Sequence, residues 1–84
     1  MNYTDVIPLQ SFKLRLNGAA VQVIRELTGL NKTAFAARTE MSLGYLSRLE
    51  SGARQPSAEN LRKIASALRV PVEAITYPDF TAKK

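Results

Sequence analysis

The hydrophobic residues of this chain recur mainly at the spacing of short amphipathic helices. Val21, Ile24 and Leu27 recur every three residues and predict the buried stripe of a first helix. Asn17 is a suitable cap for the start of this helix, and Gly29 is a suitable residue to stop it. Three polar residues fall outside the stripe: Gln22, Arg25 and Glu26.

A second helix is predicted from Asn31, a capping residue, to about residue 38. Phe35 is its expected core anchor, and the alanines around Phe35 allow a neighbouring helix to approach closely. Only a short connection follows before the next helix begins. Two helices of this length joined by three or four residues have the dimensions of a helix-turn-helix unit.

The third helix, over residues 43–51, has the clearest boundaries in the chain. Ser42 can cap its start, and Gly52 can end it because glycine adopts the left-handed conformation without steric cost. Leu46 and Leu49 share one face, which predicts packing on a core. The other face is small and mostly polar with one long guanidinium, which suits a helix in a DNA major groove. It carries Leu43, Gly44, Ser47, Arg48 and Ser51.

A fourth helix follows the cap Ser57, and a last short helix is expected over residues 70–75, with Pro71 near its start. The fourth helix has the regular helical spacing of apolar residues along one face. That stripe consists of Leu61, Ile64, Ala65 and Leu68.

The two ends of the chain have different patterns. Residues 1–16 are expected to form an N-terminal arm, in which residues 12–16 alternate as a strand with one apolar and one basic face. The sequence supplies no obvious partner strand, so this strand is expected either to pair with its counterpart in a second copy or to lie on the helices. The first alternative is slightly favoured. Residues 77–84 are expected to form a flexible basic tail.

Charge favours a polyanionic partner without establishing one. The 84 residues include 12 Lys and Arg against 7 Asp and Glu, a formal charge of +5. Many basic proteins of this size bind no nucleic acid, so charge alone does not decide the function. No apolar run approaches the ~18 residues needed to cross a bilayer, and no signal peptide is evident, so we expect a cytoplasmic protein.

The composition argues against catalysis. The chain has no cysteine and no histidine, which excludes disulfides, thiolate zinc sites and the most common general base. The carboxylates are scattered along the sequence, and no phosphate-binding glycine loop occurs. We therefore predict that the protein is not an enzyme and uses no cofactor or metal.

A set of caps, core positions and loop residues recurs at fixed offsets over residues from about 24 to 75: Leu30-Asn31, Phe35-Ala36, Met41-Ser42, Leu46-Ser47-Arg48-Leu49-Glu50-Ser51-Gly52, Arg54, Pro56-Ser57, Leu61, Ile64-Ala65 and Ala67-Leu68. In these residues the chain resembles the helix-turn-helix family of phage repressors and Cro proteins, also called the XRE family. The resemblance implies an all-α fold, a five-helix lambda-repressor-like DNA-binding bundle over residues 17–76, preceded by a short β arm.

The resemblance also implies roles for individual residues. DNA base contacts fall on Leu43, Gly44, Ser47 and Arg48. DNA backbone contacts fall on Lys32, Ser42, Tyr45, Ser51, Arg54 and Gln55. Arg25 and Glu50 correspond to a structural ion pair with no direct part in binding.

Four positions depart from the pattern of the family, and one of them is Leu43, where polar or basic residues are more common. Lys32 stands where many members have glutamine, and Glu40 and Arg69 stand where glycine is frequent. A left-handed glutamate at the first of these glycine sites would cost about 1 kcal/mol.

The function implied by the resemblance is sequence-specific regulation of transcription, as a phage-type or Cro-like repressor of the kind used in bacteriophage immunity. Such a protein occupies a double-stranded DNA operator as a homodimer, which forms either through residues 12–16 or on DNA only, and blocks polymerase. The alternative is an antitoxin or other protein-binding module of the same fold, with DNA binding secondary. An exposed apolar patch in the arm or tail would favour this alternative.

Overall fold

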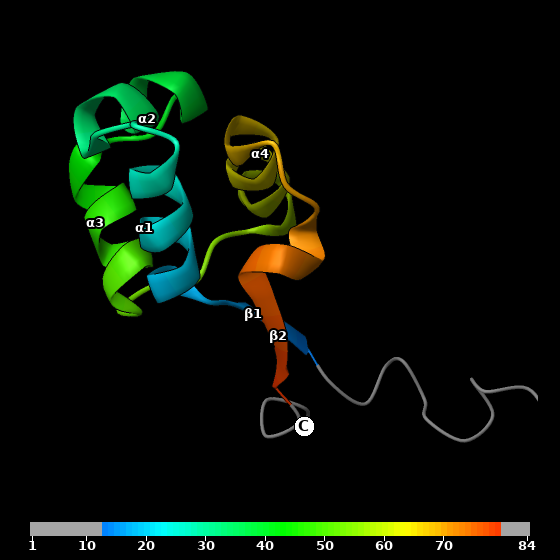
Figure 1. The fold of residues 1–84 in the computed structure, drawn as a ribbon. Coiled ribbons are helices and arrows are strands. Elements are labelled where there is room, and N and C mark those ends of the chain that lie inside the picture. Colours follow the sequence, from blue (N-terminus) through cyan, green and yellow to red (C-terminus); the bar gives the residue numbers. More distant parts are fainter. Residues whose placement is uncertain (1–12, 80–84) are drawn as a thin grey trace, which may run out of the picture.

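The computed structural model describes residues 13–79. Within this range the chain forms four α-helices, one 3₁₀ helix and two strands. In Figure 1, α1, α2 and α3 form one group, α4 stands across from α1, and the strands extend from the end of the bundle. The elements are β1 (Lys13–Leu16), α1 (Gly18–Leu27), α2 (Lys32–Thr39), α3 (Leu43–Ser51), α4 (Ala58–Leu68), η3 (Val72–Ile75) and β2 (Thr76–Asp79).

All four α-helices begin at the residues that the sequence predicts as caps. In each case the side-chain oxygen of the cap accepts the backbone N–H of the residue three positions later, which satisfies a donor that the helix itself leaves free. The caps are Asn17, Asn31, Ser42 and Ser57. These predictions are confirmed.

The core lies where α1, α2, α3 and α4 meet, with η3 closing one end. Phe35, the expected anchor of α2, is completely buried, as are Leu46 and Leu49 of α3. The stripe predicted for α4 also faces this core, with Leu61 partly buried at its margin. The buried hydrophobic residues are Leu16, Val21, Phe35, Ala36, Leu46, Leu49, Ile64, Ala65, Leu68 and Ile75.

The stripe predicted for α1 is wrong at one position. Leu27 is 81% exposed, whereas Arg25, placed outside the stripe, is only 5% exposed. Arg25 lies four residues after the fully buried Val21, so the two share the face of α1 that packs on α3. A cation can occupy this face because Glu50 of α3 supplies a buried carboxylate opposite it.

The expected fifth α-helix is also wrong, because the segment after Pro71 forms the short 3₁₀ helix η3. Only four residues separate Pro71 from β2, too few for regular α-helical bonding, and the Ala74 N–H donates to the carbonyl of Pro71 three residues before it. Ile75 is fully buried and anchors η3 in the core.

A partner for the N-terminal strand exists within the chain, contrary to the sequence expectation. β1 pairs with β2 in antiparallel register, with Leu16 opposite Thr76, and Arg15 forms an ion pair with Asp79 at 3.5 Å. Residues 77–79, expected in a basic tail, therefore belong to a strand. The sequence did not predict this strand because Pro78 lacks a backbone N–H and is unfavourable in most strands. Proline is tolerated here because β2 is an edge strand. Residues 1–12 and 80–84 of the predicted arm and tail lie outside the described residues.

No helix within residues 13–79 is long and apolar enough to cross a membrane.

α1 begins in close contact with the end of α3, and Gly18 makes this contact possible. A Cβ added at Gly18 would lie 2.4 Å from the carbonyl oxygen of Glu50 and 2.5 Å from that of Leu49. Both neighbours are backbone atoms and cannot rotate away. The absent side chain therefore sets the distance between these helices.

We expect Gly18→Ala to lower the free energy of unfolding by about 1–3 kcal/mol, because the extra carbon forces α1 and α3 apart. Urea denaturation followed by circular dichroism measures this change. Gly44→Ala is the matched control: its added Cβ meets only the Arg48 side chain, at 3.8 Å, and the same change should raise stability by about 0.5–1 kcal/mol. Equal stabilities for the two variants would contradict the close approach at Gly18.

Two of the helices end on a left-handed residue that is not glycine. Glu40 after α2 and Arg69 after α4 both have φ of 60°. These are the two positions at which the resemblance led us to expect glycine. Their backbone N–H groups bond to carbonyls of the preceding helix, so the left-handed turn is kept despite the side chain.

We expect Arg69→Gly to raise the free energy of unfolding by about 0.5–1 kcal/mol, because glycine adopts this conformation without steric cost. Arg62→Gly is the control, since Arg62 is exposed within α4 and glycine there should lower stability by about 1 kcal/mol. Thermal unfolding of both variants distinguishes the effects. A loss of stability in both would show that the left-handed turn costs nothing at Arg69.

Candidate nucleic-acid interface

The outward side of α3 carries the residues predicted to contact DNA bases. Leu46, Leu49 and Glu50 point inward and are buried, and their positions fix the rotation of the helix about its axis. The opposite side exposes Leu43 and Gly44 together with the long side chain of Arg48, and Ser47 is half-buried beside them. The structure therefore brings all four predicted base-contact residues onto one accessible part of α3.

Arg48 and Gly44 form a common surface one helical turn apart. The nearest atom to a Cβ built on Gly44 is Nη1 of Arg48, at 3.8 Å. Within residues 13–79 the guanidinium of Arg48 donates no hydrogen bond, so its donors are available to an external acceptor. Gly44 leaves the backbone of α3 bare at this point, which permits close approach by a ligand.

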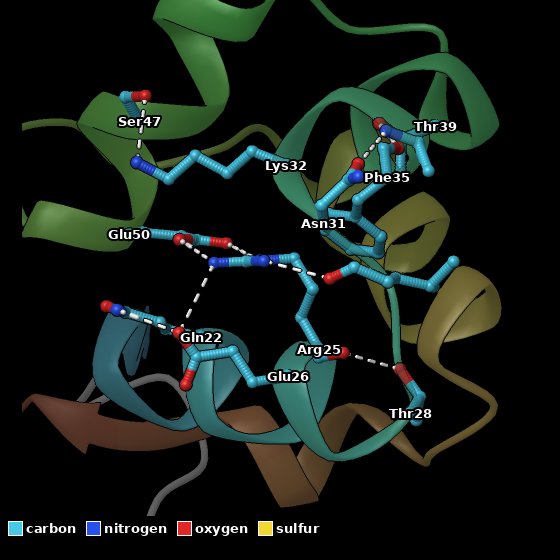
Figure 2. A network of polar contacts seen from close by, with 12 residues as sticks. Gln22, Arg25, Glu26, Thr28, Asn31, Lys32, Phe35, Thr39, Ser47 and Glu50 are labelled. Atoms are coloured by element: carbon cyan, nitrogen blue, oxygen red, sulfur yellow. Dashed lines mark hydrogen bonds and ion pairs between the residues drawn. The ribbon is translucent and has the colours of Figure 1, made fainter.

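The start of α2 is connected to α3 by Lys32. Its Nζ donates a hydrogen bond of 3.2 Å to Oγ of Ser47, as Figure 2 shows. A lysine therefore makes a direct link from the first residue of α2 to the outward side of α3. The predicted backbone-contact residue Lys32 and the predicted base-contact residue Ser47 are thus joined.

Tyr45 and Arg54 lie together on the other flank of α3. The guanidinium carbon of Arg54 stands 5.7 Å from the centre of the Tyr45 ring, within the range of a cation–π contact. The Tyr45 hydroxyl accepts a hydrogen bond of 3.1 Å from Nδ2 of Asn60 in α4. Nothing in the sequence pattern singled out Asn60, because its partner lies 15 residues away. The Tyr45 ring thus supports a cation that the resemblance assigns to the DNA backbone.

The other three predicted backbone-contact residues use polar atoms within the protein. Ser42 Oγ caps α3, and Ser51 Oγ donates to the carbonyl of Arg48 at 3.2 Å. Gln55 Oε1 accepts the backbone N–H of Leu16 at 2.8 Å, which attaches the loop after α3 to β1. The structure thus gives each of these residues an internal role alongside the predicted one.

A buried ion pair stands behind this surface. Nε of Arg25 donates to Glu50 at 2.7 Å and Nη2 donates to the second carboxylate oxygen at 3.1 Å, while Nη1 donates to the carbonyl of Leu30 at 2.9 Å (Figure 2). The exposed carboxylate of Glu26 lies 4.0 Å from Nη2 of Arg25. This is the pair that the resemblance assigns to structure. It joins α1, α3 and the loop before α2.

Hydrogen bonding to Glu50 raises the pKa of Arg25 above its ordinary value. Burial opposes the shift, and the negative charges of Glu50 and Glu26 add to it. For a cation with a raised folded pKa, the stability contribution is complete below the unfolded pKa and is lost only as pH rises through the folded value. Arg25 therefore stays charged at every pH at which proteins are normally handled.

We expect Arg25→Met to lower the free energy of unfolding by about 3–5 kcal/mol, because it leaves the Glu50 carboxylate buried without a cation. The double variant Arg25→Met/Glu50→Leu removes both charges and should recover a large part of this loss. Urea denaturation measures both, with the exposed Arg62→Met as control. A double variant less stable than the single one would contradict charge burial as the cause.

Metal binding has no support in this part of the molecule: residues 13–79 contain no cluster of three or more side chains able to hold a metal ion.

Comparisons with known proteins agree with this geometry. A family model described as helix-turn-helix matches residues 21–75. An HTH-type transcriptional regulator of Mycobacterium tuberculosis is 40% identical over 58 residues, which cover 69% of this chain and 41% of that protein. The control protein C.MunI of Mycoplasma sp is 28% identical over 67 residues, which cover 80% of this chain and 90% of that protein. The chain thus spans about two fifths of the mycobacterial regulator.

Two solved structures share the fold. The clp gene regulator ClgR from Corynebacterium glutamicum aligns with a TM-score of 0.64 and 33% identity, covering 79% of this chain and 82% of that one. The restriction-modification controller protein C.AhdI from Aeromonas hydrophila aligns with a TM-score of 0.65 and 26% identity, covering 68% of this chain and 83% of that one. With the match of the family model over residues 21–75, these alignments show that the chain belongs to the helix-turn-helix family.

Proposed function

We propose that this chain is a sequence-specific double-stranded DNA-binding transcriptional regulator that places α3 in the major groove. The observation that carries the proposal is the division of α3 into two sides. Leu46, Leu49 and Glu50 hold one side in the core, while the other presents small residues and the free guanidinium of Arg48. Arginine can bond to O6 and N7 of guanine together, and Leu43 can contact a thymine methyl group.

The charged groups that flank α3 fit contacts to the DNA backbone. Lys32 lies at the start of α2 on one flank, and Arg54 lies in the loop after α3 on the other. Contacts of this kind fix the position of the protein on the duplex and make binding sensitive to salt. The overall charge of +5 acts in the same direction.

The proposed mechanism is occupancy of an operator. A homodimer would bind two half-sites about one helical turn apart and exclude polymerase, in the manner of a phage-type or Cro-like repressor. Such a protein works on DNA in the cytoplasm and needs no cofactor or catalysis. The names of C.MunI and C.AhdI as controller proteins, and of ClgR as a gene regulator, support a regulatory role.

A protein-binding module, such as an antitoxin, is the second candidate. Exposed apolar side chains favour it: Leu14 and Tyr77 on the strands, and Val23 and Leu27 on α1. A partner protein could cover such residues. None of these four residues belongs to α3.

We expect selection from a random pool of duplexes to enrich a palindromic site. The affinity of the wild type for that site should fall steeply as the salt concentration rises. Arg48→Ala should reduce the binding free energy by about 1–3 kcal/mol, mainly through the loss of contact with one guanine. Fluorescence anisotropy over a salt series measures both effects. Arg62→Ala is the control, because Arg62 is exposed on α4 and has no place in the proposed interface.

Two results would contradict the proposal. Absence of any enriched sequence would exclude sequence-specific binding. If Arg48→Ala weakens binding to all duplexes equally, Arg48 makes no base contact. The second candidate, a partner protein bound to the exposed apolar residues, would then be favoured.

A further inference from the structure

The hydrogen bond between Lys32 and Ser47 has a fixed direction. A lysine ammonium has three donors and no acceptor, so Nζ must donate and Oγ of Ser47 must accept across their 3.2 Å separation. Both residues are half-buried and come from two helices packed on each other. The packing of α2 on α3 therefore holds the two side chains close to each other.

The hydrogen of the Ser47 hydroxyl is free for another partner. Within residues 13–79 Ser47 donates no hydrogen bond. Two other helical hydroxyls do donate to carbonyls of their own helix, Thr39 to Phe35 at 2.9 Å and Ser51 to Arg48 at 3.2 Å. Ser47 therefore differs from them: it has a donor left over, on the accessible side of α3.

We propose that Lys32 makes Ser47 a dedicated hydrogen-bond donor to a DNA base, so that the pair selects a base with an acceptor at that place in the major groove. The proposal rests on the function proposed above and adds a determinant of its specificity. A serine hydroxyl alone can contact acceptors and donors equally, because it can both give and accept a hydrogen bond. Lys32 removes this ambiguity.

Two physical effects of the ammonium act together. Its hydrogen bond occupies one lone pair of Oγ and, being charge-assisted, makes the remaining hydroxyl hydrogen a stronger donor. Its positive charge also disfavours the approach of an amino group to the other lone pair. Guanine presents N7 and O6 and thymine presents O4 in the major groove, whereas cytosine presents only its N4 amino group. Cytosine is therefore the base that the pair excludes.

A simpler role for Lys32 predicts a different result. The ammonium has two further donors, which could bind a phosphate. A phosphate contact alone would strengthen binding to every sequence by a similar factor, because phosphates carry no sequence information. The two roles can be separated by measuring discrimination between bases together with overall affinity.

The test uses the duplex selected by the wild-type chain, with each position replaced in turn by all four base pairs. Affinities are measured for the wild type, Ser47→Ala, Lys32→Met and the double variant. Lys63→Met is the control for loss of one positive charge, since Lys63 lies on α4 and pairs with Glu40. Thermal unfolding of each variant establishes that it is folded.

We expect the wild type and Lys63→Met to bind about tenfold more weakly when cytosine occupies one particular position. Ser47→Ala should reduce this discrimination to about twofold or less. Lys32→Met should reduce the discrimination against cytosine to the same level, in addition to any loss of affinity that is common to all sequences. The double variant should show no further reduction in this discrimination than either single variant.

Retention of the full discrimination against cytosine in Lys32→Met would overturn the proposal and leave Lys32 as a phosphate contact. Retention in Ser47→Ala would show that Ser47 contacts no base. If the wild type enriches no sequence, the proposed function itself fails, which is a separate outcome from either of these.

Discussion

The buried ion pair between Arg25 and Glu50 is the interaction on which the arrangement of the helices depends. Two charges taken out of water are tolerated only where nearly every donor and acceptor is satisfied. Arg25 meets this condition through both oxygens of Glu50 and the carbonyl of Leu30. Few rotations of α1 and α3 about their axes can satisfy all three bonds together. Because Glu50 is held inward, the opposite side of α3, with Gly44 and Arg48, must face outward.

The start of α3 is capped, and its end is packed closely against α1. Ser42 caps its start, and the close approach of Gly18 to the carbonyls of Leu49 and Glu50 fixes its end against α1. The side chains on the outward face therefore project from a helix whose position is fixed before the proposed binding of DNA. A rigid support reduces the entropy lost on binding, which is the usual benefit of a preorganised interface.

The features that the sequence predicted correctly are those that depend on residues close together in the chain. Caps such as Ser42 act on residues three positions away, and core residues such as Leu46 and Leu49 follow helical spacing, so both were correctly assigned. Arg25 was misplaced because its burial depends on a carboxylate 25 residues away, which hydrophobic spacing does not represent. The strand containing Pro78 was missed for a similar reason, since its pairing with β1 joins the two ends of the domain. In the candidate site, the bond between Lys32 and Ser47 depended on the packing of α2 against α3.

The β ribbon connects the ends of the domain to the loop beside the candidate interface. The Leu16 N–H donates to Gln55, and the next residue, Asn17, donates its N–H to the carbonyl of Ile75 at 2.8 Å. Gln55 directly follows Arg54, whose guanidinium lies over the Tyr45 ring. The place of Arg54 is therefore determined from two directions, by α3 through Tyr45 and by β1 through Gln55. A change in the ribbon that moved Gln55 would also move the residue that flanks α3, so the ribbon belongs to the framework of the interface.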